Sequence, residues 1–223
     1  MSNVIAITNE EENDIMLKTW HLFFLIVIVS VLISIAFQKF IMTREVYYSL
    51  LGNQMEDYRI DDYMSLMRKF QVWGYIATPL IIWLRIAFVT FLIQLPFMLK
   101  NIDIPFKVIF RIIAIAYLVL LSVDVIRFFY LYFKPAAQIT VDSLSFMPLA
   151  LTNLLNKNDY SEMIFSFLNK INLFELLWCV VVYFGLVKTK KMENIDYVLI
   201  VFFVWIGILA LTFGVTLFIR VLF

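Results

Sequence analysis

Ionisable side chains interrupt long apolar segments of this chain, and those that could pair with one another are Arg85, Asp124, Arg127 and Glu175. A charged group inside the hydrocarbon of a membrane is costly, and it normally has a partner. Such groups act as a relay for protons or substrate, contact a partner protein, or form ion pairs that fix the packing of helices. All three interpretations are open on the sequence, and structural ion pairing is the simplest.

Depth along the predicted helices indicates which groups pair. Measured from the short loop Lys100–Lys107, Arg85 and Asp124 lie about 21 and 24 Å deep, at ~1.5 Å per residue of helix. Arg127 and Glu175 also match one another in depth, nearer the opposite interface. We therefore predict the pairs Arg85–Asp124 and Arg127–Glu175. Asp124 and Arg127 are in addition spaced i,i+3, which can place them on one helix face.

Recognisable catalytic and metal-binding patterns are missing from the sequence. There is no Walker loop, no G-x-S-x-G and no H-E-x-x-H. One histidine, His21, and one cysteine, Cys179, are too few for a His-based zinc site or an internal disulfide. The net charge of +1 does not indicate the basic surface that binding of nucleic acid requires. We expect no enzymatic activity, no metal and no cofactor.

The composition places these residues in a membrane protein. Of 223 residues, 63% are hydrophobic and 16% are charged, whereas soluble domains are about 45–50% apolar and about 25% charged. Apolar runs near 20 residues are long enough to cross a bilayer as helices. The predicted fold is an all-α polytopic bundle of about five transmembrane helices with a short interfacial or re-entrant helix.

The predicted spans form a single transmembrane domain over residues 20–223, preceded by an acidic tail over residues 1–19. They cover residues 20–38, 71–99, 108–133, 172–187 and 198–219. The acidic leader favours a retained anchor over a cleavable signal peptide, which begins with a basic region.

Two stretches between or beside these spans have a different character. Residues 139–155 are apolar but contain Asp142, Pro148 and Asn153, so we expect a re-entrant or interfacial helix there, and the sequence does not decide between these two placements and a full span. From Asp61, apolar residues recur near helical spacing and predict an interfacial helix that leads into the second span.

Charge and small residues indicate orientation and contacts. The short loops Lys100–Lys107 and Lys188–Tyr197 carry the denser positive charge. Short basic loops favour the cytoplasmic side, so the N-terminus is predicted inside and the C-terminus outside. Gly207, Ala210 and Gly214 follow one side of the last span and indicate a helix–helix contact, within this chain or with a partner.

The C-terminal region resembles a known family. Asn172, Phe174 and Trp178 open the penultimate apolar helix, Gly185 and Leu186 close it, and a basic hairpin leads to a final span. This pattern is similar to the end of bacterial Yip-family proteins (the Ypt-interacting protein family), and the resemblance extends over residues 70–219. The Asp-Leu-Tyr-Gly-Pro signature of the eukaryotic branches is missing, so binding of a small GTPase is not carried over.

The resemblance implies a five-span, non-enzymatic protein of the bacterial inner membrane with a cytoplasmic N-terminus, acting through other membrane proteins. We therefore expect a scaffold or accessory subunit of a membrane assembly, with the lipid bilayer and membrane proteins as its partners. The alternative is a small transporter or channel component that uses Arg85 and Asp124. The sequence identifies no substrate.

Overall fold

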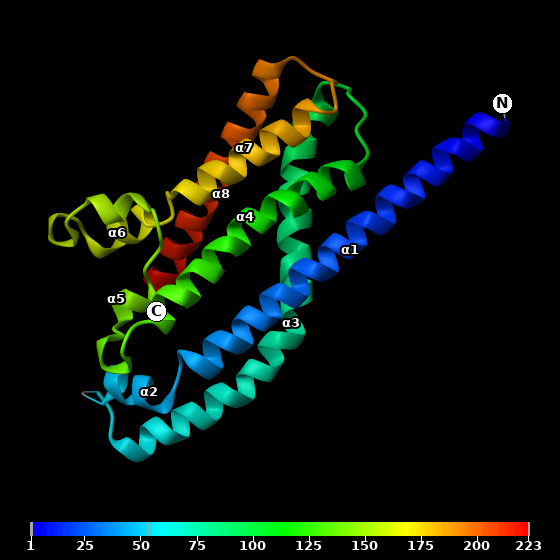
Figure 1. Ribbon diagram of the computed structural model, residues 1–223. Coiled ribbons are helices and arrows are strands. Elements are labelled where there is room, and N and C mark those ends of the chain that lie inside the picture. The colour runs from blue at the N-terminus through cyan, green and yellow to red at the C-terminus, as the bar shows by residue number, and fades with distance from the viewer. Residues whose placement is uncertain (1, 53, 223) are drawn as a thin grey trace. The chain divides into compact units, whose positions relative to one another are not determined.

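The computed structural model describes the backbone of residues 2–52 and 54–222, and the side chains of residues 18–52, 54–157 and 159–219. The predicted all-helical class is confirmed, because every regular element in the described chain is helical (Figure 1). The long elements are α1 (Ser2–Phe40), α3 (Asp57–Leu99), α4 (Phe106–Tyr132), α7 (Leu173–Val187) and α8 (Asn194–Leu222). The short ones are α2 (Arg44–Leu51), α5 (Val141–Leu144), α6 (Glu162–Leu168) and the 3₁₀ turns Ala136–Gln138, Leu151–Leu154 and Lys157–Asp159.

Four helices are long and apolar enough to cross a membrane: Lys18–Phe40 of α1, all of α3, all of α4, and Asn194–Ile219 of α8. These coincide with four of the predicted spans. The other predicted span corresponds to α7, which has 15 residues. At ~1.5 Å per residue it is about 22 Å long, shorter than the ~30 Å hydrocarbon core.

The helix bounds differ most from prediction at the start of α3. The predicted interfacial helix and the predicted span over residues 71–99 form one helix of 43 residues. No proline or glycine occurs between Asp57 and Gly74, so nothing breaks the backbone hydrogen bonding where the amphipathic part meets the apolar part. Most side chains of the acidic tail predicted over residues 1–19 lie outside the described residues.

By contacts the chain divides into two compact units. The first contains residues 1–25, 84–120 and 149–223, and the second contains residues 26–83 and 121–148. The helices α1, α3 and α4 each continue from one unit into the other.

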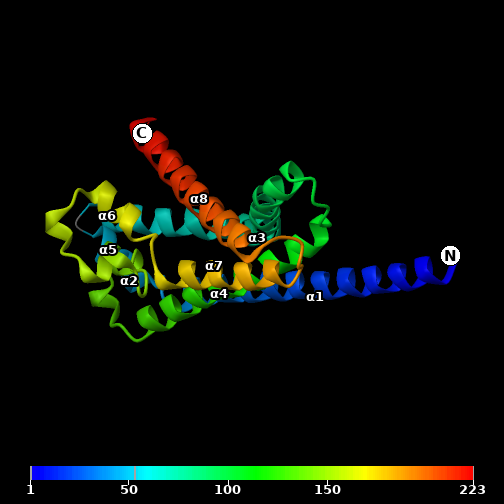
Figure 2. The same cartoon turned by 90° about the horizontal axis from the view of Figure 1, so that it is seen from above.

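In the first unit, α3, α4, α7 and α8 each contribute fully buried apolar side chains. Its most completely buried side chains, each without measurable exposure, are Ile86, Ile93, Phe97, Ile109, Val182, Leu186 and Tyr197. The hydroxyl of Tyr197 accepts hydrogen bonds from the backbone N–H of Lys191 at 2.8 Å and of Met192 at 2.9 Å. These bonds tie the α7–α8 loop to the start of α8, and the two helices diverge away from that loop (Figure 2).

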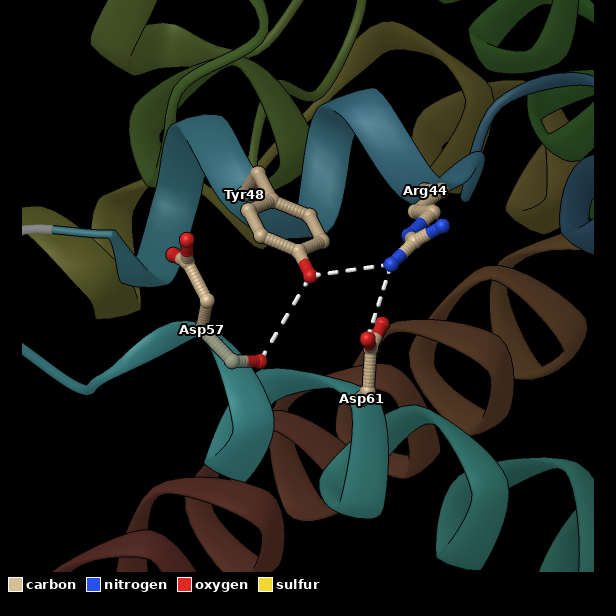
Figure 3. Close-up of polar contacts among 4 residues, drawn as sticks. All are labelled: Arg44, Tyr48, Asp57 and Asp61. Atoms are coloured by element: carbon tan, nitrogen blue, oxygen red, sulfur yellow. Dashed lines mark hydrogen bonds and ion pairs between the residues drawn. The ribbon is translucent and has the colours of Figure 1, made fainter.

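In the second unit, α2 packs on the first turns of α3. Tyr47 of α2 forms a buried cluster with Ile60 and Met64 of α3. Figure 3 shows polar contacts beside this cluster: Arg44 donates to Asp61 at 2.7 Å and to the hydroxyl of Tyr48 at 3.2 Å. A buried apolar cluster and an exposed ion pair therefore both join α2 to the first turns of α3.

Residues 139–155 do not form one helix. α5 begins at the N-cap Thr140, whose side chain accepts from the N–H of Ser143, and a 3₁₀ turn over Leu151–Leu154 follows. Between them, Leu149 has a positive φ of 53°, a backbone conformation that ends a helix. The chain there pairs with residues 171–173 instead, through the bonds Leu151 N–H to Ile171 C=O and Leu173 N–H to Leu149 C=O.

Candidate functional site

The most chemically distinctive site of the first unit is a polar cluster around Arg85. A small cavity of about 50 Å³ is lined by Arg85 of α3, Tyr117 of α4, Glu175 and Trp178 of α7, and Trp205 of α8. The guanidinium carbon of Arg85 lies 5.4 Å from the centre of the Tyr117 ring. A cation at this distance over an aromatic face is attracted by the ring's quadrupole.

Glu175 supplies the opposite charge of this cluster. It lies in the first turn of α7, where the helix dipole favours a carboxylate, and it lines the same cavity as Arg85. Its depth also fits: Glu175 is 12 residues before Val187 and Arg85 is 14 before Leu99, which is about 18 and 21 Å at ~1.5 Å per residue. Two predicted site residues, Arg85 and Glu175, are therefore brought to one cavity.

The cavity contains a further donor. The indole Nε1 of Trp205 is buried and has no hydrogen-bond partner among the described residues. The volume of about 50 Å³ has room for water but not for an organic solute, since ligand pockets measure about 300–1,000 Å³. The arrangement can hold opposite charges close together and orient water between them.

The other two predicted site residues lie together in the second unit. Asp124 Oδ1 and Arg127 Nη1 are 3.8 Å apart at the i,i+3 spacing seen in the sequence. Arg127 Nη2 also donates to the backbone carbonyl of Leu144 at 2.7 Å, so this residue ties α4 to α5. The predicted pairs Arg85–Asp124 and Arg127–Glu175 would each join residues of different units, and both stay predictions.

The residues that carry the family resemblance begin helix α7 or pack it against the rest of the first unit. Asn172 is the buried N-cap of α7: its Oδ1 accepts from the N–H of Glu175 at 3.0 Å, and its Nδ2 donates to the carbonyl of Lys170 at 3.2 Å. Phe174 and Trp178 are buried one turn apart. A side chain at Gly185 would collide with Ile112 of α4, so this glycine allows α7 and α4 to touch.

Sequence reasoning missed two residues of the cluster, Tyr117 and Trp205. Tyr117 is 11 residues into α4, far from the interfaces where tyrosine is usually found in membrane helices. That mid-span position was the available signal. Trp205 gives no comparable signal, because its approach to the cavity depends on how α8 is rotated.

Other candidate chemistry is sparse. Among the residues whose side chains are described, no three of His, Cys, Asp and Glu gather in a way that could hold a metal ion. Cys179 is a free, half-buried thiol of α7, and His21 is an exposed residue of α1.

Comparison of the chain with known protein families, curated proteins and solved structures finds no match. The resemblance to the Yip family therefore stays a prediction.

Proposed function

We propose that this chain is a non-enzymatic, multi-pass membrane protein that serves as a scaffold or accessory subunit of a membrane assembly. The observation that carries the proposal is an uncovered face of α8, formed by Gly207, Ala210 and Gly214 and called the small-residue face below. All three residues are exposed, and their i, i+3, i+7 spacing puts them on one side of the helix.

The small-residue face is suited to a helix from another protein. A Cβ added at Gly207 or at Gly214 would meet no atom of the described chain within 4 Å, so at these positions the chain does not pack a helix of its own. In a membrane, helices associate through small residues that let backbones approach closely. The contact predicted from the sequence is thus better supplied by a partner than by this chain.

The spans are also poorly covered by their own chain. Only 22% of the most apolar window of α8 and 11% of that of α1 are buried. Exposed Phe24, Ile28 and Leu32 follow one another along α1. Lipid can cover such surfaces, and so can neighbouring membrane proteins, which is what an accessory subunit requires.

The proposal includes five spans, with α7 as the fourth, and a cytoplasmic N-terminus. A span of 15 residues is accommodated by local thinning of the bilayer and by a flanking lysine that reaches toward the interface. Lys188, directly after α7, supplies that lysine. Placement in a bacterial inner membrane is supported by the family resemblance.

A transporter or channel component is the second candidate, and the Arg85 cluster is what favours it. Charged groups around an intramembrane cavity are typical of proton pathways. The cavity of about 50 Å³ would suit water and protons but not a larger solute. Proton flux into vesicles that contain the purified protein would favour this candidate if Glu175→Gln abolished it.

Affinity purification from mild detergent, followed by identification of bound proteins, tests the scaffold proposal. We expect specific membrane proteins to co-purify with the unmodified chain and to be lost from Gly207→Ile and Gly214→Ile. Gly74→Ile is the matched control, because Gly74 is an exposed helical glycine of α3 with open space around it. Absence of specific partners, or equal loss from the Gly74 variant, would contradict the proposal.

A further inference from the structure

An apolar groove runs between α4 and α7, within the first unit. Its volume is about 550 Å³, and its walls include Ile112 and Ile115 of α4 and Val181 and Phe184 of α7. The first half of α4 runs alongside α7 in both views (Figure 1, Figure 2), and Gly185 keeps the two helices in contact at Ile112. The groove is therefore an apolar cleft formed by these two helices.

Two cations line the same groove. Arg111 is five residues into α4, and Lys188 directly follows the last residue of α7. In the part of the chain whose side chains are described, neither side chain has a hydrogen bond or an ion pair. Both lie toward the loops that end these helices, so their long side chains can reach the headgroup layer of a bilayer.

A second groove, between α3 and α8, gives an internal comparison. It is also apolar, with a volume of about 440 Å³, and it contains Lys100. There the cation is neutralised, because Lys100 Nζ lies 2.7 Å from Asp196 Oδ1. Both grooves can take an apolar chain. Among their described side chains, unpaired positive charge occurs in the groove between α4 and α7 and not in the groove between α3 and α8.

We propose that the groove between α4 and α7 binds an anionic phospholipid, with an acyl chain along the apolar walls and the phosphate between Arg111 and Lys188. The occupant must combine a long apolar part with an anionic end, and it must reach the groove from within the membrane. An anionic lipid meets all three requirements. Guanidinium is well suited to phosphate because its planar fork can donate two parallel hydrogen bonds, and lysine adds a point charge. This inference does not depend on the proposed scaffold function.

Native mass spectrometry of the detergent-purified chain tests the lipid site. Phosphatidylglycerol and phosphatidylcholine with identical acyl chains are added stepwise, and the bound fractions are compared. A basic residue near a membrane surface contributes about a fivefold preference for anionic lipid, so we expect Arg111→Gln and Lys188→Gln each to lower phosphatidylglycerol binding about fivefold. The double variant should lose about 25-fold on the same basis, and Arg111→Lys should retain most binding.

Two controls separate the site from general charge effects. Lys191→Gln removes one positive charge from the same loop, at an exposed residue that does not line the groove, and should bind phosphatidylglycerol like the unmodified chain. Ile115→Trp, which fills the groove, should reduce binding without changing any charge. Glycerol phosphate, which has the headgroup without acyl chains, should not compete at concentrations at which phosphatidylglycerol saturates.

Three outcomes would overturn the lipid site: equal binding of phosphatidylcholine, unchanged binding by the Arg111/Lys188 double variant, or the same loss from Lys191→Gln. A variant is folded if it keeps the elution volume and the helical circular dichroism of the unmodified chain. Should Arg111→Gln fail this check, Lys188→Gln and Ile115→Trp still decide the question, because they alter the two ends of the groove separately.

Discussion

The partner of Arg85 can be decided by a set of double substitutions. The geometry brings Arg85 and Glu175 to one cavity, whereas depth along the sequence also predicts a pair with Asp124. Replacing one member of an ion pair strands the other, but replacing both can be nearly neutral. We therefore predict that Glu175→Leu destabilises the protein in detergent and that adding Arg85→Leu restores most of the loss.

The size of the effect follows from the depth of Arg85. It lies 14 residues before Leu99, about 21 Å along a helix that crosses a core of about 30 Å. A stranded arginine at the membrane centre costs about 2.5–3.5 kcal/mol, and one nearer an interface costs less because its side chain can reach water. A loss of about 2–3 kcal/mol is expected, which is a fall in Tm of roughly 5–10 °C for a chain of this size.

Thermal stability is measured by size-exclusion chromatography of detergent-solubilised protein after heating. Arg85→Leu and Glu175→Leu are each compared with the double variant, and Arg85→Leu with Asp124→Leu provides the matched alternative. If Arg85→Leu/Glu175→Leu is no more stable than the worse single variant, the pairing with Glu175 is wrong. If the combination with Asp124→Leu restores stability instead, the pair predicted from the sequence is the correct one.

Three further predictions concern topology and local structure. Reporter fusions at Lys191 and after Phe223 should report cytoplasmic and external locations respectively; both on one side would mean that α8 does not cross the membrane, and the reverse pattern would contradict the orientation. Asn172→Ala should destabilise the chain by about 0.5–2 kcal/mol through loss of the α7 cap, whereas Asn172→Asp should retain most of the stability; equal melting of the two variants would contradict the cap. Tyr197→Phe should cost about 0.5–1.5 kcal/mol for each of the two loop hydrogen bonds it removes, measured as reduced thermal stability in detergent, and an unchanged Tm would show that those donors find other partners.

The long helices were predictable from the sequence, because each is a run of apolar residues that must satisfy its backbone hydrogen bonds internally in a membrane. α2 was not, since its eight residues owe their position to packing against Ile60 and Met64 of α3. The same limit applies to residues 139–155, where the backbone at Leu149 and pairing with the start of α7 decide the local structure.

The residues of the candidate site were predictable, but their pairing was not. Counting residues placed Arg85 near the middle of the membrane and Glu175 nearer the opposite interface, and it does not say which helices are neighbours or how each is rotated. For that reason the sequence favoured Asp124 as the partner of Arg85 and missed Tyr117 and Trp205. The sequence showed Asn172 and Gly185 only as parts of a motif. The structure shows that Asn172 caps α7 and that Gly185 lies against Ile112.

Site-specific photo-crosslinking in intact membranes tests the scaffold proposal most directly. A photo-reactive amino acid is placed at Ala210, on the small-residue face of α8. The control position is Val215, which is also exposed. It lies about 100° around the helix from Gly214, and so on a different face. We predict that Ala210 crosslinks to a specific membrane protein, that Val215 yields mainly lipid adducts, and that Gly214→Ile abolishes the crosslink from Ala210. Lipid adducts alone from Ala210, or the same protein crosslinked from both positions, would contradict the account.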